Sequence, residues 1–268
     1  MLIDTHAHLD FSQFDQDREK IITELAKLGI SIINVGSHKQ ACLDSVALAK
    51  KYENIYAAVG IHPHDAEKIR NIPELIEFLR DLAIKDKVVA IGECGLDYYT
   101  FDQGKFKKEL TSKTKNQQKE VFKAQLELAK QLKLPVIIHN RESHADLLKI
   151  IKKFKNRGVL HCFAGDLKFL KEILDLGFYV GFDGNITFKN AQELQKAVKS
   201  TPLNRILIET DCPFLTPEPF RGLRNEPKNV KIIADFISGL KQLPLAKVVE
   251  TTNKNAQKLF NLKNEKTN

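Results

Sequence analysis

The chain of 268 residues contains no tryptophan, and its four cysteines (Cys42, Cys94, Cys162 and Cys212) form no C-x-x-C pair. This spacing indicates neither a zinc ribbon nor a redox pair, so we expect reduced thiols. No apolar run approaches the ~20 residues of a membrane-spanning helix, and the start lacks the basic and apolar segments of a signal peptide. Internal repeats and low-complexity tracts are also absent from the sequence. These absences predict a soluble, cytoplasmic protein that does not enter a membrane.

The charge of the chain is positive, with 42 Lys and Arg against 34 Asp and Glu, for a net charge of +8. Nine lysines and three acidic residues lie between Lys105 and Lys133. Such a surface attracts polyanions and accelerates their encounter. Lysine-rich surface helices that only contact solvent would give the same composition. Charge therefore supports a nucleic-acid substrate without establishing one.

Segments typical of strands and of helices alternate along the whole chain. The predicted strands are 2–6, 30–36, 55–61, 87–93, 134–139, 158–162, 178–182 and 204–210. The predicted helices are 16–28, 39–52, 73–84, 115–132, 143–156, 167–176, 189–199, 228–241 and 244–260. Eight strands, each followed by a helix, predict an α/β protein with a (β/α)8 TIM-type barrel. We expect one barrel domain over residues 1–262 and a disordered tail over 263–268.

Side chains of the types that bind metal ions lie at the ends of five predicted strands. These residues are His6, His8, Glu93, His139, His161 and Asp211. In a closed barrel the C-terminal ends of all strands converge on one pocket, so the six can meet there. An open doubly wound sheet would hold the first and eighth strands too far apart. The set of ligands therefore favours the barrel over the open sheet.

Four imidazoles and two carboxylates are too many for one catalytic ion, and they suit two divalent ions. We expect His6, His8 and Asp211 to hold one ion, His139 and His161 to hold the other, and Glu93 to bridge them. Two ions ~3.5–4 Å apart can bind both the attacking and the leaving oxygen of an ester, and they lower the pKa of bound water toward ~7. Asp211 is our candidate general base, with Glu93 as its catalytic partner. A lone histidine is more often a hydrogen-bonded core residue, and a lone carboxylate can cap a helix, so the prediction depends on the set.

The identity of the metal is left open by these ligands. Four histidines suit Zn, Mn, Fe or Co better than Mg, which prefers oxygen ligands. We therefore expect two divalent ions of the kind of Mg, Mn or Zn, at a site that accepts several of them.

Eight stretches of the sequence closely resemble the TatD family of metal-dependent hydrolases, a branch of the amidohydrolase superfamily. The stretches are LIDTHAHLD (2–10), VGIHPH (59–64), IGECGLDYY (91–99), PVIIHNR (135–141), HCFAG (161–165), ETDCPFLTP (209–217), RGLRNEP (221–227) and NKNAQKLF (253–260). The resemblance covers nearly the whole chain. It implies a (β/α)8 fold and a divalent-metal nuclease, with 3′→5′ exonuclease action on single-stranded DNA as the best-known activity. It also implies assay metals such as Mg and Mn.

The resemblance carries the ligand roles over to the same six residues and draws attention to others around them. It implies that His64 lies near the substrate phosphate, with His62 as a weaker candidate. Arg141 can meet a phosphate in a bidentate contact, or it can form an ion pair with an acidic residue. Glu209 is expected to support the ligands from behind. The segment after the eighth predicted strand carries four more polar residues, Arg221, Arg224, Asn225 and Glu226. Their presence is explained as well by an internal salt bridge and the start of the next helix as by a catalytic role.

The sequence departs from the family pattern in the stretch after Arg141 and at Cys94 and Cys212. No ligand is lost. Cys94, Cys162 and Cys212 each directly follow a proposed ligand, so strand alternation predicts that they face the helices as small packing residues.

Three functions remain open on the sequence alone. The first is a 3′→5′ exodeoxyribonuclease acting on single-stranded DNA. The second is a deacylase of D-aminoacyl-tRNA, which hydrolyses an ester at the same kind of site. The third is a non-catalytic metal-binding protein, although no obligate protein partner is inferred. The best candidate platform for stacking bases is the aromatic cluster of Tyr98, Tyr99, Phe101 and Phe106. The alternative is that these rings pack within their own loop.

Overall fold

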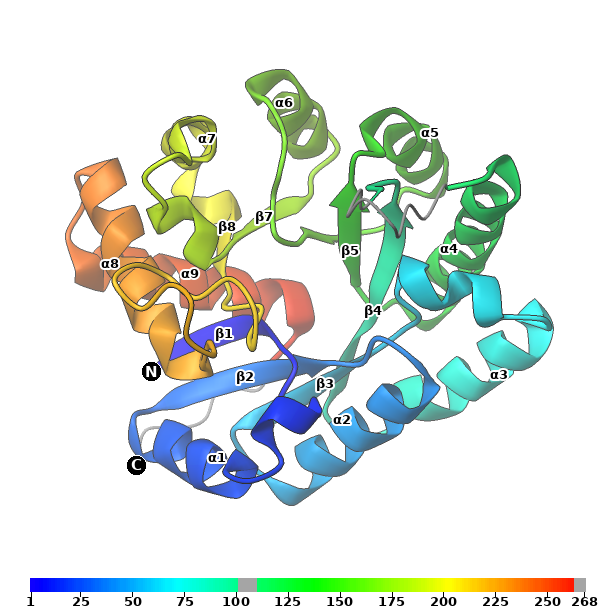
Figure 1. The fold of residues 1–268 in the computed structure, drawn as a ribbon, viewed down its shortest axis with the longest axis horizontal. Helices are drawn as coiled ribbons and strands as arrows, with labels where there is room; N and C mark the ends of the chain where they lie inside the picture. Colours follow the sequence, from blue (N-terminus) through cyan, green and yellow to red (C-terminus); the bar gives the residue numbers. More distant parts are fainter. Residues whose placement is uncertain (101–109, 263–268) are drawn as a thin grey trace.

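The computed structural model describes residues 1–100 and 110–262 and shows eight parallel strands surrounded by helices (Figure 1). The strands are β1 (Leu2–Ala7), β2 (Ile30–Val35), β3 (Ile55–Val59), β4 (Val88–Asp97), β5 (Val136–Arg141), β6 (Gly158–Leu160), β7 (Tyr179–Phe182) and β8 (Ile206–Ile208). They are hydrogen-bonded in the order β1 to β8. The predicted (β/α)8 architecture is therefore confirmed. The proposed tail at 263–268, like Phe101 and Phe106, lies outside the described residues.

The helices follow the strands in the order that the sequence predicts. They are α1 (Arg18–Lys27), α2 (Lys39–Lys51), α3 (Ile72–Ala83), α4 (Ser112–Leu132), α5 (His144–Phe154), α6 (Leu167–Asp175), α7 (Gln192–Ser200), α8 (Val230–Lys241) and α9 (Leu245–Phe260). None of these helices combines the length and the apolar character needed to cross a membrane within the described ranges. One apolar layer lies between the strands and the helices, and a second fills the barrel interior. Burial on both faces explains why the strands are continuous apolar runs.

Helix α9, drawn in red in Figure 1, runs beside β1 and β8 and supplies part of the barrel interior. Its residues Ala256, Leu259 and Phe260 pack with interior strand residues such as Ile3 and Leu207. The amide of Asn253 extends this contact, because its Oδ1 accepts a hydrogen bond from the Ile3 nitrogen. Helix α9 thus packs against the end of the barrel where the strands begin. A substrate pocket is left to the opposite end, where the strands finish.

Strand β4 is longer than the sequence predicts and continues to Asp97. The prediction ended it at Glu93, where the apolar run over residues 88–92 stops. The structure instead contains a register irregularity between Ile91 and Cys94, after which the strand pairs with β5 as far as Arg141. The prediction placed Glu93 at the end of a strand, but in the structure Glu93 lies within one.

The barrel closes between β1 and β8 through a seam of mixed main-chain and side-chain hydrogen bonds. The Asp211 nitrogen donates to the His6 carbonyl at 2.9 Å, and the His8 nitrogen donates to the Cys212 carbonyl at 2.9 Å. The buried Asp4 carboxylate accepts from the Thr210 nitrogen at 2.9 Å and from the Thr210 hydroxyl at 2.6 Å. Burial raises the pKa of Asp4 to about 8. The same seam that joins the two ends of the sheet therefore fixes His6, His8 and Asp211 beside one another.

Replacing Thr210 with valine should destabilise the fold, because it removes the hydroxyl that donates to Asp4 Oδ2 and leaves that buried oxygen without its side-chain donor. We expect the free energy of unfolding to fall by about 1–3 kcal/mol. Thr23→Val is the matched control, since its exposed hydroxyl bonds only to Glu19 of its own helix, and it should change stability by less than about 0.5 kcal/mol. Urea unfolding followed by circular dichroism measures both. Equal stability of Thr210→Val and the native chain would contradict the role of the seam.

Candidate metal centre

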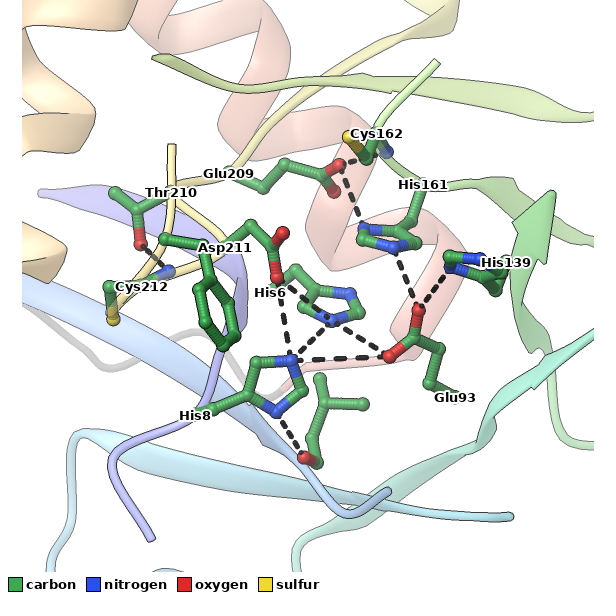
Figure 2. Close-up of polar contacts among 12 residues, drawn as sticks. His6, His8, Glu93, His139, His161, Cys162, Glu209, Thr210, Asp211 and Cys212 are labelled. Carbon is green, nitrogen blue, oxygen red and sulfur yellow. Dashed lines mark hydrogen bonds and ion pairs between the residues drawn. The ribbon is translucent and has the colours of Figure 1, made fainter. Parts of the chain in front are cut away.

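All six predicted ligand residues converge at the C-terminal end of the barrel (Figure 2). A cavity of about 730 Å³ opens there, and five of the six line it, while His6 lies beneath and is fully buried. Figure 2 shows Glu93 between the His6–His8 pair on one side and the His139–His161 pair on the other. Barrel closure thus brings together side chains separated by up to 205 positions in the sequence (211 − 6).

The first group of donors consists of His6, His8, Glu93 and Asp211. The Nε2 atoms of His6 and His8 are 3.1 Å apart. Glu93 Oε2 lies 3.6 Å from His6 Nε2 and 4.0 Å from His8 Nε2. Asp211 Oδ1 lies 3.8 and 3.4 Å from the same two nitrogens. With metal–ligand bonds of about 2.1 Å, a tetrahedral ion separates its ligand atoms by about 3.4 Å. The four donors therefore have the spacing of one coordination sphere.

The second group gathers on the other oxygen of Glu93. Glu93 Oε1 lies 2.9 Å from His139 Nδ1 and 2.8 Å from His161 Nε2. Two imidazoles on one carboxylate oxygen, opposite a second pair on the other oxygen, place Glu93 where a bridging ligand between two ions would have to be. Imidazole nitrogens suit ions such as zinc or iron better than magnesium, which prefers oxygen ligands.

The charges in this cluster depend on one another. Burial alone would raise the pKa of Glu93, but the charge of the neighbouring His161 imidazole and the contacts to His139 and His161 hold it well below its usual value. Burial alone would lower the pKa of His8, but the hydrogen bond to Asp211 outweighs it and raises the pKa to about 9. The carboxylates of Glu93 and Glu209 raise the pKa of His161 in the same way against its burial. In the metal-free protein, protons therefore occupy positions that a cation would take.

Several groups contact the donor residues on the side away from the cavity and orient their side chains. The Nδ1 of His8 contacts the Val35 carbonyl at 2.8 Å, which leaves Nε2 directed at the cavity. Glu209, predicted to support the ligands, accepts a hydrogen bond from the Cys162 nitrogen at 2.5 Å and lies 3.3 Å from His161 Nδ1. Gly181 makes room for it, because an added Cβ would lie 2.4 Å from Glu209 Oε2. Such contacts fix the ring orientation of ligating histidines.

Asp97 belongs to the site, although the sequence reasoning missed it. Its Oδ2 lies 3.0 Å from His139 Nε2 and 3.0 Å from His64 Nε2. Burial alone would raise its pKa, but the contacts to these two histidines lower it below the usual value. The signal was present in the sequence, because residues 93, 95 and 97 of one strand share a face. It was overlooked because the strand was ended too early.

His64 and His62 both reach the cavity from the segment after β3. His64 is exposed and meets Asp97. His62, expected to be the weaker candidate, lies 3.8 Å from Glu93 Oε1, and burial lowers its pKa to about 3. His62 is therefore neutral at physiological pH and lies closer to the ligands than His64 does.

The predicted arginines divide between the cavity and the surface. Arg141 lines the cavity, and its guanidinium stacks 3.6 Å from the centre of the Tyr99 ring. Arg221 packs over Phe188 at 4.1 Å and is not among the described residues that line the cavity. Arg224 forms a bidentate ion pair with Asp17, at 2.8 and 2.6 Å, and reaches Glu226 at 3.1 Å. The internal salt bridge considered for this segment is therefore the correct interpretation of Arg224 and Glu226.

Asn225 is buried and holds the loop that carries Asp211. Its Nδ2 donates to the Thr210 carbonyl at 2.9 Å and to the Phe214 carbonyl at 2.6 Å. It therefore acts on the site through the backbone of this loop.

The four cysteines are free thiols, as expected. Cys94 and Cys212 pack in the apolar layer between sheet and helices, which confirms their predicted orientation. The prediction for Cys162 is wrong, because this residue lines the cavity and its sulfur lies within 4.8 Å of carboxylate oxygens of Asp183 and Asp211. Its backbone has φ of 45°, so the strand alternation on which the prediction rested has already ended there.

A barrel whose strand ends gather imidazoles and carboxylates around one cavity has the arrangement of a metal-dependent hydrolase. The family described as TatD related DNase matches residues 3–261. The chain belongs to this family of metal-dependent hydrolases. It is 41% identical over 266 residues to an uncharacterized metal-dependent hydrolase, YabD, of Bacillus subtilis, with 98% of this chain and 100% of the relative covered.

Two further comparisons agree with this assignment. A protein of Pectobacterium carotovorum named 3′-5′ ssDNA/RNA exonuclease TatD is 31% identical, over 97% of this chain and 100% of that protein. The crystal structure of YjjV, a TatD homologue from Escherichia coli, superposes with a TM-score of 0.87 at 30% identity and covers 98% of both chains.

Loading the metal-free protein with zinc or manganese should release protons, because the raised pKa of His8 and of His161 keeps protons on nitrogens that must bind the ion. The apparent affinity should therefore rise as the pH increases from about 6 toward 9. Calorimetric titration in buffers of different ionisation enthalpy measures the released protons. His8→Ala should weaken binding, whereas His144→Ala, which removes a histidine outside the cavity, should not. A binding heat that is independent of the buffer would contradict the expectation.

Proposed function

We propose that this TatD-family hydrolase is a 3′→5′ exonuclease that removes mononucleotides from single-stranded DNA. The observation that carries the proposal is the six-residue donor cluster at the base of an open cavity, on a chain with a net charge of +8. A cavity of about 730 Å³ is large enough for a nucleotide. The named activity of the Pectobacterium relative supports the same substrate.

In this proposal one divalent ion would be held by His6, His8 and Asp211, a second would be held by His139 and His161, and Glu93 would serve both. When bound, such ions would lower the pKa of the attacking water and stabilise charge on the phosphate. Asp211 accepts the proton of the water in this proposal, because its carboxylate lines the cavity beside the donors, with Oδ1 3.8 Å from His6 Nε2 and 3.4 Å from His8 Nε2. The hydrogen bond to His8 keeps the pKa of Asp211 below its usual value despite burial, so the carboxylate is ionised at neutral pH.

Two residues on the β3 and β5 side of the cavity are placed to hold the phosphate. His64 is exposed, and its Nε2 lies 3.0 Å from Asp97 Oδ2. Arg141 lines the same side with its guanidinium stacked on Tyr99. In our proposal these two side chains position the scissile phosphate over the donor cluster. The water oxygen forms a bond to phosphorus as the phosphorus–O3′ bond breaks. The products are a 5′-mononucleotide and a shortened strand whose O3′ takes up a proton to become a hydroxyl.

Asp211→Asn should reduce hydrolysis of 3′-labelled single-stranded DNA by about 10²–10⁴-fold, the range expected for the loss of a general base. Asp175→Asn is a matched control, because Asp175 lies at the end of α6 in an exposed pair with Lys171. Initial rates with the metal-reconstituted protein measure the effect. Equal rates for Asp211→Asn and the native protein would assign the activity to a contaminating nuclease.

The rate at low DNA concentration should fall steeply with salt, because binding to a polyanion releases counterions. A parallel assay on D-aminoacyl-tRNA separates the alternative deacylase from the nuclease. The nuclease releases mononucleotides and leaves the aminoacyl ester intact. Cleavage of the ester with the polynucleotide left whole would refute the proposed activity and support the deacylase.

A further inference from the structure

Two phenylalanines form part of the cavity wall beside the first donor group. Phe11 lies in the segment after β1, and Phe214 lies in the loop after β8. Phe214 is 47% exposed although it is a large apolar side chain. A single exposed apolar residue is ordinary on a protein surface. Here the exposed Phe214 contacts Phe11, which is half-buried against the core, and both lie on the wall of a cavity with a hydrolytic centre, which indicates a binding surface.

The two rings and His8 form one continuous aromatic wall. The ring of Phe11 stacks on that of His8, with centroids 5.0 Å apart and an interplanar angle of 29°. The ring of Phe214 meets Phe11 edge to face, with centroids 5.8 Å apart and an angle of 82°. A planar ligand that packs on this wall would therefore lie next to a nitrogen of the donor cluster.

Backbone hydrogen bonds hold the main chain of both phenylalanines close to the donor residues. The Phe214 nitrogen donates to the Asp211 carbonyl at 2.9 Å, and its carbonyl accepts from Asn225 Nδ2 at 2.6 Å. The Phe11 nitrogen donates to the His8 carbonyl at 3.2 Å, and its carbonyl accepts from Arg18 Nη2 at 3.1 Å. Each phenylalanine is thus three residues after a proposed ligand and anchored to it. A preorganised surface of this kind binds a ligand with little loss of conformational freedom.

The tyrosines favoured by the sequence are occupied by other contacts. The Arg141 guanidinium lies 3.6 Å from the centre of the Tyr99 ring, and the Lys115 ammonium lies 4.7 Å from that of Tyr98. The Tyr98 hydroxyl also donates to Asp146 at 2.9 Å. The β5 side of the cavity therefore offers the Arg141 guanidinium, whereas the β1 and β8 side offers the apolar rings of Phe11 and Phe214. This division matches a nucleotide, which has an anionic phosphate and a planar base.

We infer that Phe11 and Phe214 form a nucleobase subsite that holds the terminal base of the strand by stacking and apolar contact. The inference rests on the proposed nuclease function and adds the part of the substrate that this wall recognises. The phosphate lies over the donor cluster toward Arg141, and the base extends toward β1 and β8. Because every base has a π-face, such a subsite binds all four bases with little preference.

The test compares equilibrium binding of two probes, 2′-deoxyguanosine 5′-monophosphate and 2-deoxyribose 5-phosphate, to the metal-loaded protein. The native chain should bind the nucleotide more tightly. Phe214→Leu should weaken nucleotide binding by about tenfold, the size expected for one stacked base, and leave the sugar phosphate unchanged. Phe220→Leu is the control, because Phe220 is 46% exposed in the same loop but is not among the described residues that line the cavity.

Equal affinities of the native chain for the two probes would overturn the subsite, as would native nucleotide binding by Phe214→Leu. Cleavage of single-stranded DNA by the same variants separates this inference from the proposed function. A protein that binds the nucleotide through Phe214 but cleaves no DNA refutes the nuclease and keeps the subsite. If the Phe214→Leu variant cleaves DNA at the native rate and with the native KM, the subsite is refuted and the nuclease function is retained.

Discussion

The buried carboxylate of Glu93 is the group around which the rest of the site is arranged. It is only 4% exposed, and five imidazoles, those of His6, His8, His62, His139 and His161, lie within 4.0 Å of its two oxygens. An ionised carboxylate that is removed from water is costly unless positive charge compensates it. In the metal-free chain, protons on His8, His139 and His161, whose pKa values are raised by the neighbouring carboxylates, supply that charge. Bound cations would supply it in the loaded chain.

The fold surrounds Glu93 with residues that are distant in the sequence, because it brings them to one end of the barrel. Helix α9 packs into the end where the strands begin, so the open cavity lies at the other end. The irregular register of β4 places Glu93 inside a strand, with Asp97 further along the same face. The Asp4–Thr210 contact joins the first strand to the segment after the last one. Stability and site geometry therefore depend on the same seam.

The barrel and the ligand set could be predicted because each ligand follows an apolar run that is buried on both faces, which identifies a strand and its end. The runs before His139, His161 and Asp211 show this most clearly. Asp97 was missed because the predicted strand ended with the apolar run before Glu93, whereas β4 continues to Asp97. The orientation of Cys162 depends on a positive φ at that residue. The aromatic wall could not be found, because the contact of Phe11 with Phe214 exists only after the barrel closes.

The measurement that tests the central claim most directly is anomalous diffraction from crystals of the protein soaked with manganese or zinc. The account predicts two peaks about 3.5–4 Å apart on either side of the Glu93 carboxylate. One peak should lie among His6, His8 and Asp211, and the other should lie beside His139 and His161. A well-ordered site with no anomalous peak at Glu93, or with metal bound only elsewhere, would contradict it.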